Sequence, residues 1–359
     1  MIFSTTYMPT RYCKYALLLC LLLSLTQRLY AQSDSLPRRW QIELTFDYLF
    51  DNKEFETSPI GESYTLAGVW VRPTLSLRLG NNSEHRLYLG ANLLKEMGTR
   101  KVIDTAHLTA YYQVQYQGWE ARIGLFPSHY VTDHLSERFI ERKAQFLRPI
   151  MNGIQLSQRG DHHFVNLWLD WLTKKGATDR ERFHAGLTTK YHRGIFVAES
   201  NLRMMHLATS DLANTVLDDL QGELLLGIQS HFDTFNFGAA VGLYGTIERD
   251  RYEQKCYRNI GALGTFNADW KKRIGLNGYV YYGTGHQQMR GQYGSLLYLE
   301  HPMLQAPLYL QTVGYWQIFD THFRGKLPAH CAMRLELGLH ILPSALSSHQ
   351  ALTLSVQIP

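Results

Sequence analysis

Histidines beside carboxylates are the residues of this 359-residue chain whose spacing most resembles a reactive site. His162 and His163 directly follow Asp161. Imidazole and carboxylate groups both bind zinc, but a zinc site takes typically about four ligands, which is more than this run supplies. Because the run also follows Gly160, where the chain is predicted to turn tightly, we expect a polar turn with no metal and no cofactor.

Asp133, His134 and Glu137 form a second group, with the residue types of an acid–base pair. Asp133 is also a residue type that caps helix N-termini, and capping accounts for it without catalysis. No G-x-S-x-G elbow, H-E-x-x-H pair or Walker loop occurs in the sequence. We therefore expect no catalytic residue and a protein that is not an enzyme.

The elements that position these residues follow a secretory leader. Basic residues including Arg11 precede a leucine-rich run over 16–26, and Ala31 follows at a plausible cleavage site. At about eleven residues the run is too short to cross about 30 Å of hydrocarbon. We predict a cleavable signal peptide over 1–31 and one mature domain over 32–359.

Export also limits what the cysteines can do. Cys20 lies inside the leucine run with no small residue before it, so lipidation is an alternative that its surroundings do not favour. Cleavage leaves Cys256 and Cys331, and two thiols exclude a disulfide scaffold. We predict Cys256 in an external loop and Cys331 near the periplasmic end of a strand. Both should stay unpaired, because a disulfide bridges no more than about 7 Å between Cα atoms.

The mature chain is nearly neutral. Cleavage would remove Arg11, Lys14 and Arg28, which leaves a net charge of +2 from the 36 basic and 31 acidic residues of the full chain. This balance gives no reason to propose nucleic acid as a partner.

Apolar and polar residues alternate at period two through the mature sequence, which is typical of strands with one apolar and one polar face. The segment 40–50 has apolar even positions, and 331–341 has apolar odd positions. Many segments hold the alternation for about nine to thirteen residues, the length that a tilted strand needs to cross a bilayer. The predicted strands are 40–50, 64–79, 86–94, 105–116, 119–126, 151–158, 162–171, 183–192, 194–204, 220–231, 235–246, 259–270, 273–284, 306–319, 329–341 and 350–358.

The connections support the same fold, because long odd-numbered gaps alternate with mostly short even-numbered gaps. Outer-membrane barrels have long external loops and short periplasmic turns. We predict an all-β fold: a single transmembrane, antiparallel, up-and-down β-barrel of about 14–16 strands, with both termini periplasmic. The alternative is a secreted soluble β-sandwich or β-helix, although sandwich strands typically run only about five to six residues.

The longest well-punctuated loop, 127–149, contains a predicted short helix over 134–147 with apolar and charged sides. Its flanks read Gly124-Leu-Phe-Pro127 and Arg148-Pro-Ile-Met-Asn-Gly-Ile-Gln155. Here the chain resembles the porins of Gram-negative outer membranes, sixteen-strand barrels whose third external loop bends into the lumen. The resemblance covers most of the mature chain and implies a helix-bearing inward loop and a homotrimer. Porins usually end in an aromatic residue, whereas this chain ends in Pro359.

If the apolar rows face lipid, the polar rows line a water-filled lumen. The loop residues predicted to narrow this lumen are Arg138, Arg142, Lys143, Arg148, Glu137 and Glu141. The predicted wall residues are Arg72, Arg78, Arg86, Arg122, Arg182, His184, Lys190 and Arg334. Basic side chains select against cations at close range. We therefore expect an outer-membrane channel for passive, weakly anion-favouring passage of small hydrophilic solutes, with outer-membrane lipids around it.

Other functions fit the same pattern. A polar lumen has to be solvated and charge-balanced whether or not it conducts. An outer-membrane hydrolase, protease-like or phospholipase-like, would use His and Asp near the external rim. A plugged barrel would have a structural or adhesive role and work through its external loops.

Overall fold

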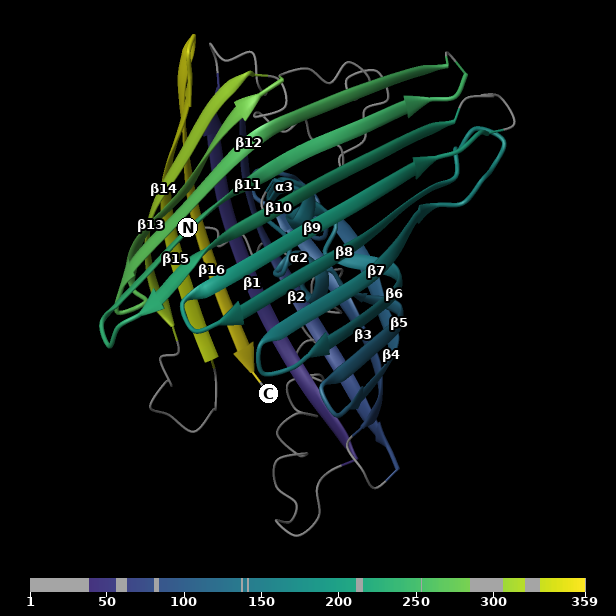
Figure 1. Cartoon of the computed structure of the whole chain (residues 1–359). Helices are drawn as coiled ribbons and strands as arrows, with labels where there is room; N and C mark the ends of the chain where they lie inside the picture. Colours follow the sequence, from purple (N-terminus) through teal and green to yellow (C-terminus); the bar gives the residue numbers. More distant parts are fainter. Residues whose placement is uncertain are drawn as a thin grey trace, which may run out of the picture.

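The computed structural model describes residues 39–55, 63–80, 84–136, 138–140, 142–210, 216–252, 254–284, 306–319 and 330–358. The strands in this part of the chain are β1 (Trp40–Glu54), β2 (Tyr64–Leu79), β3 (His85–Glu96), β4 (Thr105–Tyr116), β5 (Trp119–Pro127), β6 (Ile150–Arg159), β7 (His163–Thr173), β8 (Arg182–Arg193), β9 (Phe196–Leu207), β10 (Leu217–His231), β11 (Phe235–Asp250), β12 (Lys255–Trp270), β13 (Ile274–Gly283), β14 (Leu308–Phe319), β15 (His330–Leu342) and β16 (Ala345–Ile358). They form one closed antiparallel barrel, in which β1 pairs with both β2 and β16 (Figure 1). The predicted fold class is confirmed. The signal peptide predicted over 1–31 lies outside the described residues.

Two short helices, α2 (His129–Thr132) and α3 (Arg142–Leu147), lie in the connection between β5 and β6. The barrel has two ends. β1 begins and β16 ends at the same one, which we call the terminal end, and the opposite one is the far end. That the terminal end faces the periplasm stays a prediction. Within the described residues, no helix is long and apolar enough to cross a membrane.

Side chains alternate between an outer surface and the lumen, as predicted. Outward side chains such as Leu89, Val241 and Leu337 are 57%, 70% and 61% exposed. Inward polar side chains such as Asn166 and Asn201 are fully buried. The apolar rows therefore form the outer surface, and the polar rows enclose the lumen.

Strand boundaries differ from the predicted ones mainly at the far end. β16 begins at Ala345 rather than at 350, so a short turn replaces the predicted connection. The outward-facing Gln350 accepts a hydrogen bond from Asn52 of β1 at 2.8 Å. Outward positions at this end lie beyond the apolar belt, so the alternation of hydropathy fades there although strand pairing continues.

The same extension corrects the position of one cysteine. β12 begins at Lys255, so Cys256 lies in a strand and not in the predicted external loop. Cys331 lies near the terminal end of β15, as predicted. Both thiols are free.

Pro73 lies at an irregular position in the sheet, as its missing N–H requires. The pairing of β2 with β3 is interrupted between Val71 and Thr74. Gly90 of β3 makes room for this bend, because a Cβ there would lie 2.5 Å from the Pro73 carbonyl oxygen.

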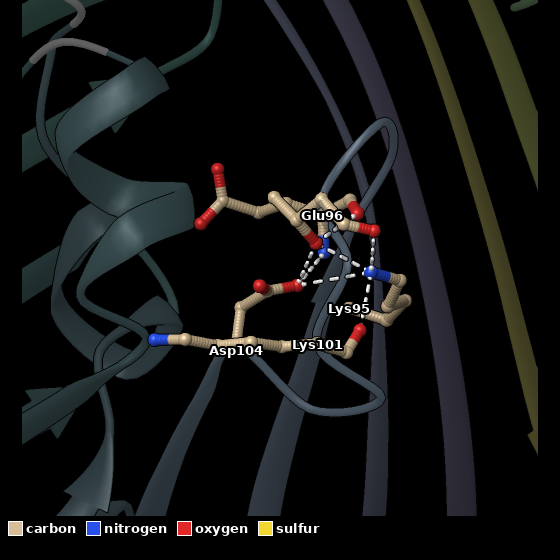
Figure 2. Close-up of polar contacts among 5 residues, drawn as sticks. Lys95, Glu96, Lys101 and Asp104 are labelled. Carbon is tan, nitrogen blue, oxygen red and sulfur yellow. Dashed lines mark hydrogen bonds and ion pairs between the residues drawn. The ribbon is translucent and has the colours of Figure 1, made fainter.

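The connection between β3 and β4 is held by a polar cluster around Lys95 (Figure 2). The Lys95 ammonium donates to the carbonyl oxygens of Thr99 and Lys101 at 3.0 and 2.6 Å. It also lies 3.4 Å from the carboxylate of Asp104. That carboxylate accepts hydrogen bonds from the Glu96 amide and the Thr99 hydroxyl, both at 2.8 Å. This far-end loop is therefore tied to the end of β3 by side chains as well as by backbone pairing.

The order of this loop is expected to depend on the charge of Asp104. Desolvation acts to raise the pKa of Asp104, but the Glu96 amide, the Thr99 hydroxyl and the Lys95 ammonium together hold it below its ordinary value. A depressed folded-state pKa stabilises the fold above the ordinary aspartate value, and the contribution is lost as pH falls through the depressed one. The Glu96 amide should therefore stay protected from hydrogen exchange at pH 5 and lose protection only below about pH 4. Asp104→Asn keeps an acceptor oxygen but no charge, so we expect weaker protection of the Glu96 amide at pH 5 and no loss on further acidification. Unchanged protection of this amide in the variant at pH 5 would contradict this account.

Candidate functional site

The connection between β5 and β6, residues 128–149, enters the lumen, and we call it the inward loop (Figure 1). Phe146 of α3 packs in a buried cluster with Trp70 of β2 and Leu94 of β3. The Trp70 indole N–H donates to the Phe146 carbonyl at 2.9 Å. This side of the loop is therefore fixed to the wall formed by β1–β3.

The inward loop contacts two further sectors of the wall. Phe139 and Ile140 belong to a buried cluster with residues of β10–β15, among them Tyr244. Val131 of α2 packs in another cluster with Trp168 and residues of β4–β6. Because the loop is anchored on three sides, it spans the lumen, and the predicted inward bend is confirmed.

Charged residues of the inward loop bind partners on the barrel wall. The ion pairs are Arg138–Glu223 at 2.8 Å, Arg142–Glu336, and Arg148–Asp170 at 3.4 Å. The Lys143 ammonium lies 4.4 Å from the centre of the Tyr64 ring. Glu137 and Glu141, also predicted to narrow the lumen, lie outside the described residues. The described residues predicted to narrow the lumen thus lie within it, and their charges are engaged by the wall.

Breaking the Arg138–Glu223 pair is expected to destabilise the barrel. The side chains are 10% and 0% exposed, so Arg138→Met would leave a buried carboxylate without its cation. Leaving one partner of a buried ion pair without its counter-charge lowers the stability of the fold by about 3–5 kcal/mol. The double variant Arg138→Met/Glu223→Gln should lose less stability, because it leaves no buried charge without a partner. Urea unfolding in lipid vesicles measures both, and equal costs would contradict the expectation.

The predicted wall residues lie on the inner faces of their strands. They are Arg72, Arg78, Arg86, Arg122, Arg182, His184, Lys190 and Arg334. Carboxylates balance several of them: Arg72 lies 2.7 Å from Asp47, and Lys190 lies 2.7 Å from Glu199. The expected preference for anions stays a prediction.

A cavity of about 620 Å³ lies at the terminal end, beside the turn between β4 and β5. Its lining includes Glu120 and Arg122 of β5 and Tyr130 and His134 of the inward loop. The Arg122 guanidinium lies 3.4 Å from the centre of the Tyr130 ring and donates to Gln155 at 2.6 Å. Charged and aromatic groups thus line a space large enough for a small polar solute.

His162 lies in the turn between β6 and β7, as predicted, and His163 is the first residue of β7. The His162 ring is 5.6 Å from that of His192, measured between ring centres. No group of three potential metal ligands occurs among the residues that the structure describes. This turn therefore shows no converging set of ligands.

Asp133 and His134 lie in the inward loop, and the predicted helix over 134–147 is wrong at its start. Asp133 is the C-cap of α2, and α3 begins only at Arg142. The segment between them is irregular because Phe139 has to reach its cluster across the lumen. Burial, then the positive charges of Lys190, Arg159 and Arg122, lower the pKa of His134, so its imidazole is neutral at pH 7.

A histidine, a carboxylate and a guanidinium meet on the outer surface at the far end. His206 of β9 and Asp218 of β10 are direct partners in the ladder. His206 Nδ1 lies 2.7 Å from Asp218 Oδ1. Arg251 Nε and Nη2 each lie 2.7 Å from Asp218 Oδ2. We call His206, Asp218 and Arg251 the rim site.

Strand alternation orients the rim site. Met205 and Leu207 are 3% and 7% exposed and face the lumen, so His206 between them faces outward. The residues on either side of Asp218 are buried in the same way. The His206 and Asp218 side chains keep 22% and 24% of their surface exposed, so a molecule outside the barrel can reach them.

Aromatic and apolar side chains surround the rim site. The Phe183 ring lies 5.1 Å from that of His206 and 5.4 Å from that of Trp171, measured between ring centres. Toward the terminal end, the outer surface becomes apolar, with Leu202 and Ile247 41% and 43% exposed. The rim site therefore lies where a polar rim meets an apolar wall.

Among the described strands, the outward-facing histidines are His85, His163 and His206, and His206 alone lies at the far end. His206 is not among the predicted site residues, because the predicted strands end at 204 and begin again at 220 and residues 205–219 fall in the predicted connection between them. Met205 and Leu207 are apolar but face the lumen, in the opposite phase from the outward apolar residues Leu202 and Met204, so the period-two pattern is broken where the strand continues.

Comparisons with known proteins give a family and a fold. A family model described as lipid A 3'-O-deacylase-type matches residues 33–358. No curated protein matches the chain. The chain is similar to the solved structure of OccK2 (OpdF) of Pseudomonas aeruginosa, with 11% identity, a TM-score of 0.50, and coverage of 89% of this chain and 97% of that one.

Two further solved structures are also similar. OccAB3 of Acinetobacter baumannii has 10% identity, a TM-score of 0.49, and coverage of 89% of this chain and 98% of that one. A loop-deletion mutant of OmpT, an outer membrane protein of Vibrio cholerae, has 8% identity, a TM-score of 0.47, and coverage of 89% and 100%. The likeness to OccK2, together with the closed sixteen-strand barrel, confirms the predicted porin-like outer-membrane fold.

The family match corrects one expectation. The missing serine-elbow, zinc and phosphate-loop motifs predict a protein that is not an enzyme, and this prediction is wrong, because the matching family is described by an enzymatic activity. Those motifs consist of residues close in sequence. Strand pairing instead joins residues such as His206 and Asp218, which a connection separates.

Proposed function

Because the chain belongs to the lipid A 3'-O-deacylase-type family, we propose that it is an outer-membrane esterase that removes an ester-linked acyl chain from a lipid A-like glycolipid. We place the reaction at the rim site. The observation that carries this proposal is the pairing of His206 with Asp218 at 2.7 Å on the outer surface of the barrel. A membrane lipid can approach that surface without entering the lumen.

In this mechanism His206 is the general base. Asp218 accepts the hydrogen bond from Nδ1–H, which fixes the tautomer and leaves Nε2 to take a proton from water. The water oxygen attacks the ester carbonyl carbon and forms a tetrahedral intermediate. The bond between that carbon and the sugar oxygen then breaks, and His206 returns the proton to the sugar oxygen. The products are a fatty acid and a glycolipid with one new hydroxyl group.

Arg251 supports the reaction in two ways. Its contact with Asp218 Oδ2 holds the carboxylate in place for His206. The Arg251 side chain is 52% exposed, so its remaining N–H groups can donate to the oxyanion of the intermediate. Hydrogen-bond donors aimed at developing negative charge supply a large part of the rate enhancement in acyl transfer.

The environment of the rim site suits a lipid ester. The apolar outer surface on the terminal-end side of the rim site, called here the apolar wall, includes Leu202 and Ile247 and accommodates acyl chains. The polar surface at the far end accommodates a sugar headgroup. The proposal requires the far end to face the cell exterior, as the predicted periplasmic position of the termini implies. It leaves the lumen without a role in the reaction.

The direct test is to incubate the purified chain with lipid A in detergent micelles and analyse the products by mass spectrometry. We expect a glycolipid lighter by one acyl chain and one equivalent of free fatty acid. Lipid A that remains intact under conditions in which the barrel stays folded would contradict the proposal.

Passive passage of small hydrophilic solutes, with a weak preference for anions, is the second candidate. The observation that favours it is the terminal-end cavity, which Arg122 helps to line. The inward loop argues against free passage, because its contacts reach three sides of the lumen. Conductance in planar bilayers distinguishes the two candidates.

A further inference from the structure

We propose that Arg249 and Arg258, called here the arginine pair, form a binding site for a phosphate group of the glycolipid that the rim site processes. The inference rests on the proposed function for the identity of the ligand. Its own evidence is the position, exposure and charge balance of these two residues. The arginine pair would contact the headgroup of the lipid, whereas the rim site contacts the reacting ester.

The arginine pair lies next to the rim site on the same outer surface. In the strand ladder, Arg249 of β11 lies opposite Asp218 of β10 on one side and opposite Cys256 of β12 on the other. Arg258 follows Cys256 by two residues in β12, so Arg249 and Arg258 are diagonal neighbours with Cα atoms about 7–8 Å apart. Both side chains are exposed. Two flexible guanidinium groups at this separation can reach one phosphate.

The outer surface around the arginine pair carries more positive than negative charge, which favours binding of an anion. Among the described outward residues at the far ends of β9–β12, Asp218 is the one carboxylate. His206 occupies its Oδ1 and Arg251 occupies its Oδ2. Arg249 and Arg258 thus add two positive charges that no carboxylate in this part of the described surface offsets.

The depth of the pair also fits a lipid phosphate. Arg258 pairs with Ile247, and Ile260, two residues further along β12, is 60% exposed on the apolar wall. A guanidinium at the boundary between the polar rim and the apolar wall lies at the level of a headgroup. Arginine binds phosphate through two parallel hydrogen bonds, which gives orientation as well as affinity. The pair would therefore fix where the acyl ester lies relative to His206.

Binding of lipid A is the measurement that tests the pair. The full chain carrying His206→Ala, which leaves the lipid uncleaved, is titrated in detergent micelles with phosphorylated lipid A and with enzymatically dephosphorylated lipid A. Adding Arg249→Gln/Arg258→Gln should weaken binding of the phosphorylated lipid by about tenfold for each charge-assisted hydrogen bond that the substitutions remove. Binding of the dephosphorylated lipid should not change.

Matched controls make the result specific. Arg193→Gln/Arg273→Gln removes two exposed arginines at the terminal end and should change neither titration. Excess inorganic phosphate should compete if the pair accepts any phosphate, and should not if it requires the lipid. Equal weakening for both lipids, or none, would overturn the proposal.

The outcome is distinguishable from failure of the proposed function. If the arginine variants lose binding only to the phosphorylated lipid while His206→Ala still releases fatty acid, the phosphate site stands and the catalytic assignment falls. If His206→Ala is inactive and the arginine variants bind normally, the reverse holds.

Discussion

Replacing His206 by alanine is expected to slow acyl-chain removal by about 10²- to 10⁴-fold, the range that a positioned general base supplies. The variant keeps the strand and the apolar wall but has no group that takes a proton from water. Asp218→Asn should also slow the reaction, because an amide in place of the carboxylate no longer holds the Nδ1–H tautomer. The rate of fatty acid release from lipid A in micelles, followed by mass spectrometry, measures each effect.

His163→Ala is the matched control for this experiment. His163 faces outward from β7 and is exposed like a typical surface histidine, but it lies at the terminal end. We expect its removal to leave the rate unchanged. Heat-modifiable migration on gels shows whether each variant is still a folded barrel. A folded His206→Ala barrel that releases fatty acid at the original rate would show that the rim site does not carry out the reaction.

Replacing the inward loop by a short linker is expected to open the lumen, so that the barrel conducts ions. The two ends of the loop are already joined, because the Ser128 amide donates to the Pro149 carbonyl at 2.7 Å. A few glycine and serine residues in place of 129–148 can therefore connect β5 to β6 without distorting them. Loss of the loop removes Phe139 and Phe146, whose clusters lie on different sides of the lumen.

Planar bilayer recordings measure this effect. We expect no stepwise current from the full chain and large, salt-dependent steps from the loop-replacement variant. The same linker placed in the 174–181 connection, which lies outside the three buried clusters described for the inward loop, serves as the control and should not conduct. Equal currents from the full chain and the loop-replacement variant would show that the inward loop leaves the lumen open.

The barrel could be predicted from sequence because its signal is local. Each strand carries its own alternation, so segments such as 64–79 and 105–116 are recognised without knowledge of their partners, and the structure reproduces both boundaries. The inward loop could also be predicted, since its length and apolar residues distinguish it from the other connections. Its contacts were not, because Arg138 and Glu223 are 85 residues apart.

The rim site could not be predicted because it depends on the register between two strands. Asp218 contacts His206 only because β9 and β10 pair as far as their last residues at the far end. There the outward positions are polar, and hydropathy no longer marks them as strand. Arg251 follows the end of β11 and joins them through a third strand. A search for motifs along the sequence examines none of these relationships.

The pairing of β1 with β16 has a consequence for how the chain is made. The ladder runs from Leu44 opposite Ile358 to Glu54 opposite Ser348, so the edge of β1 that β2 does not occupy can pair only after β16 has been synthesised. A nascent or truncated chain keeps two open strand edges, which are templates for aggregation. The barrel can therefore close only after β16 has been made, and until then both edges are exposed to pairing with other chains.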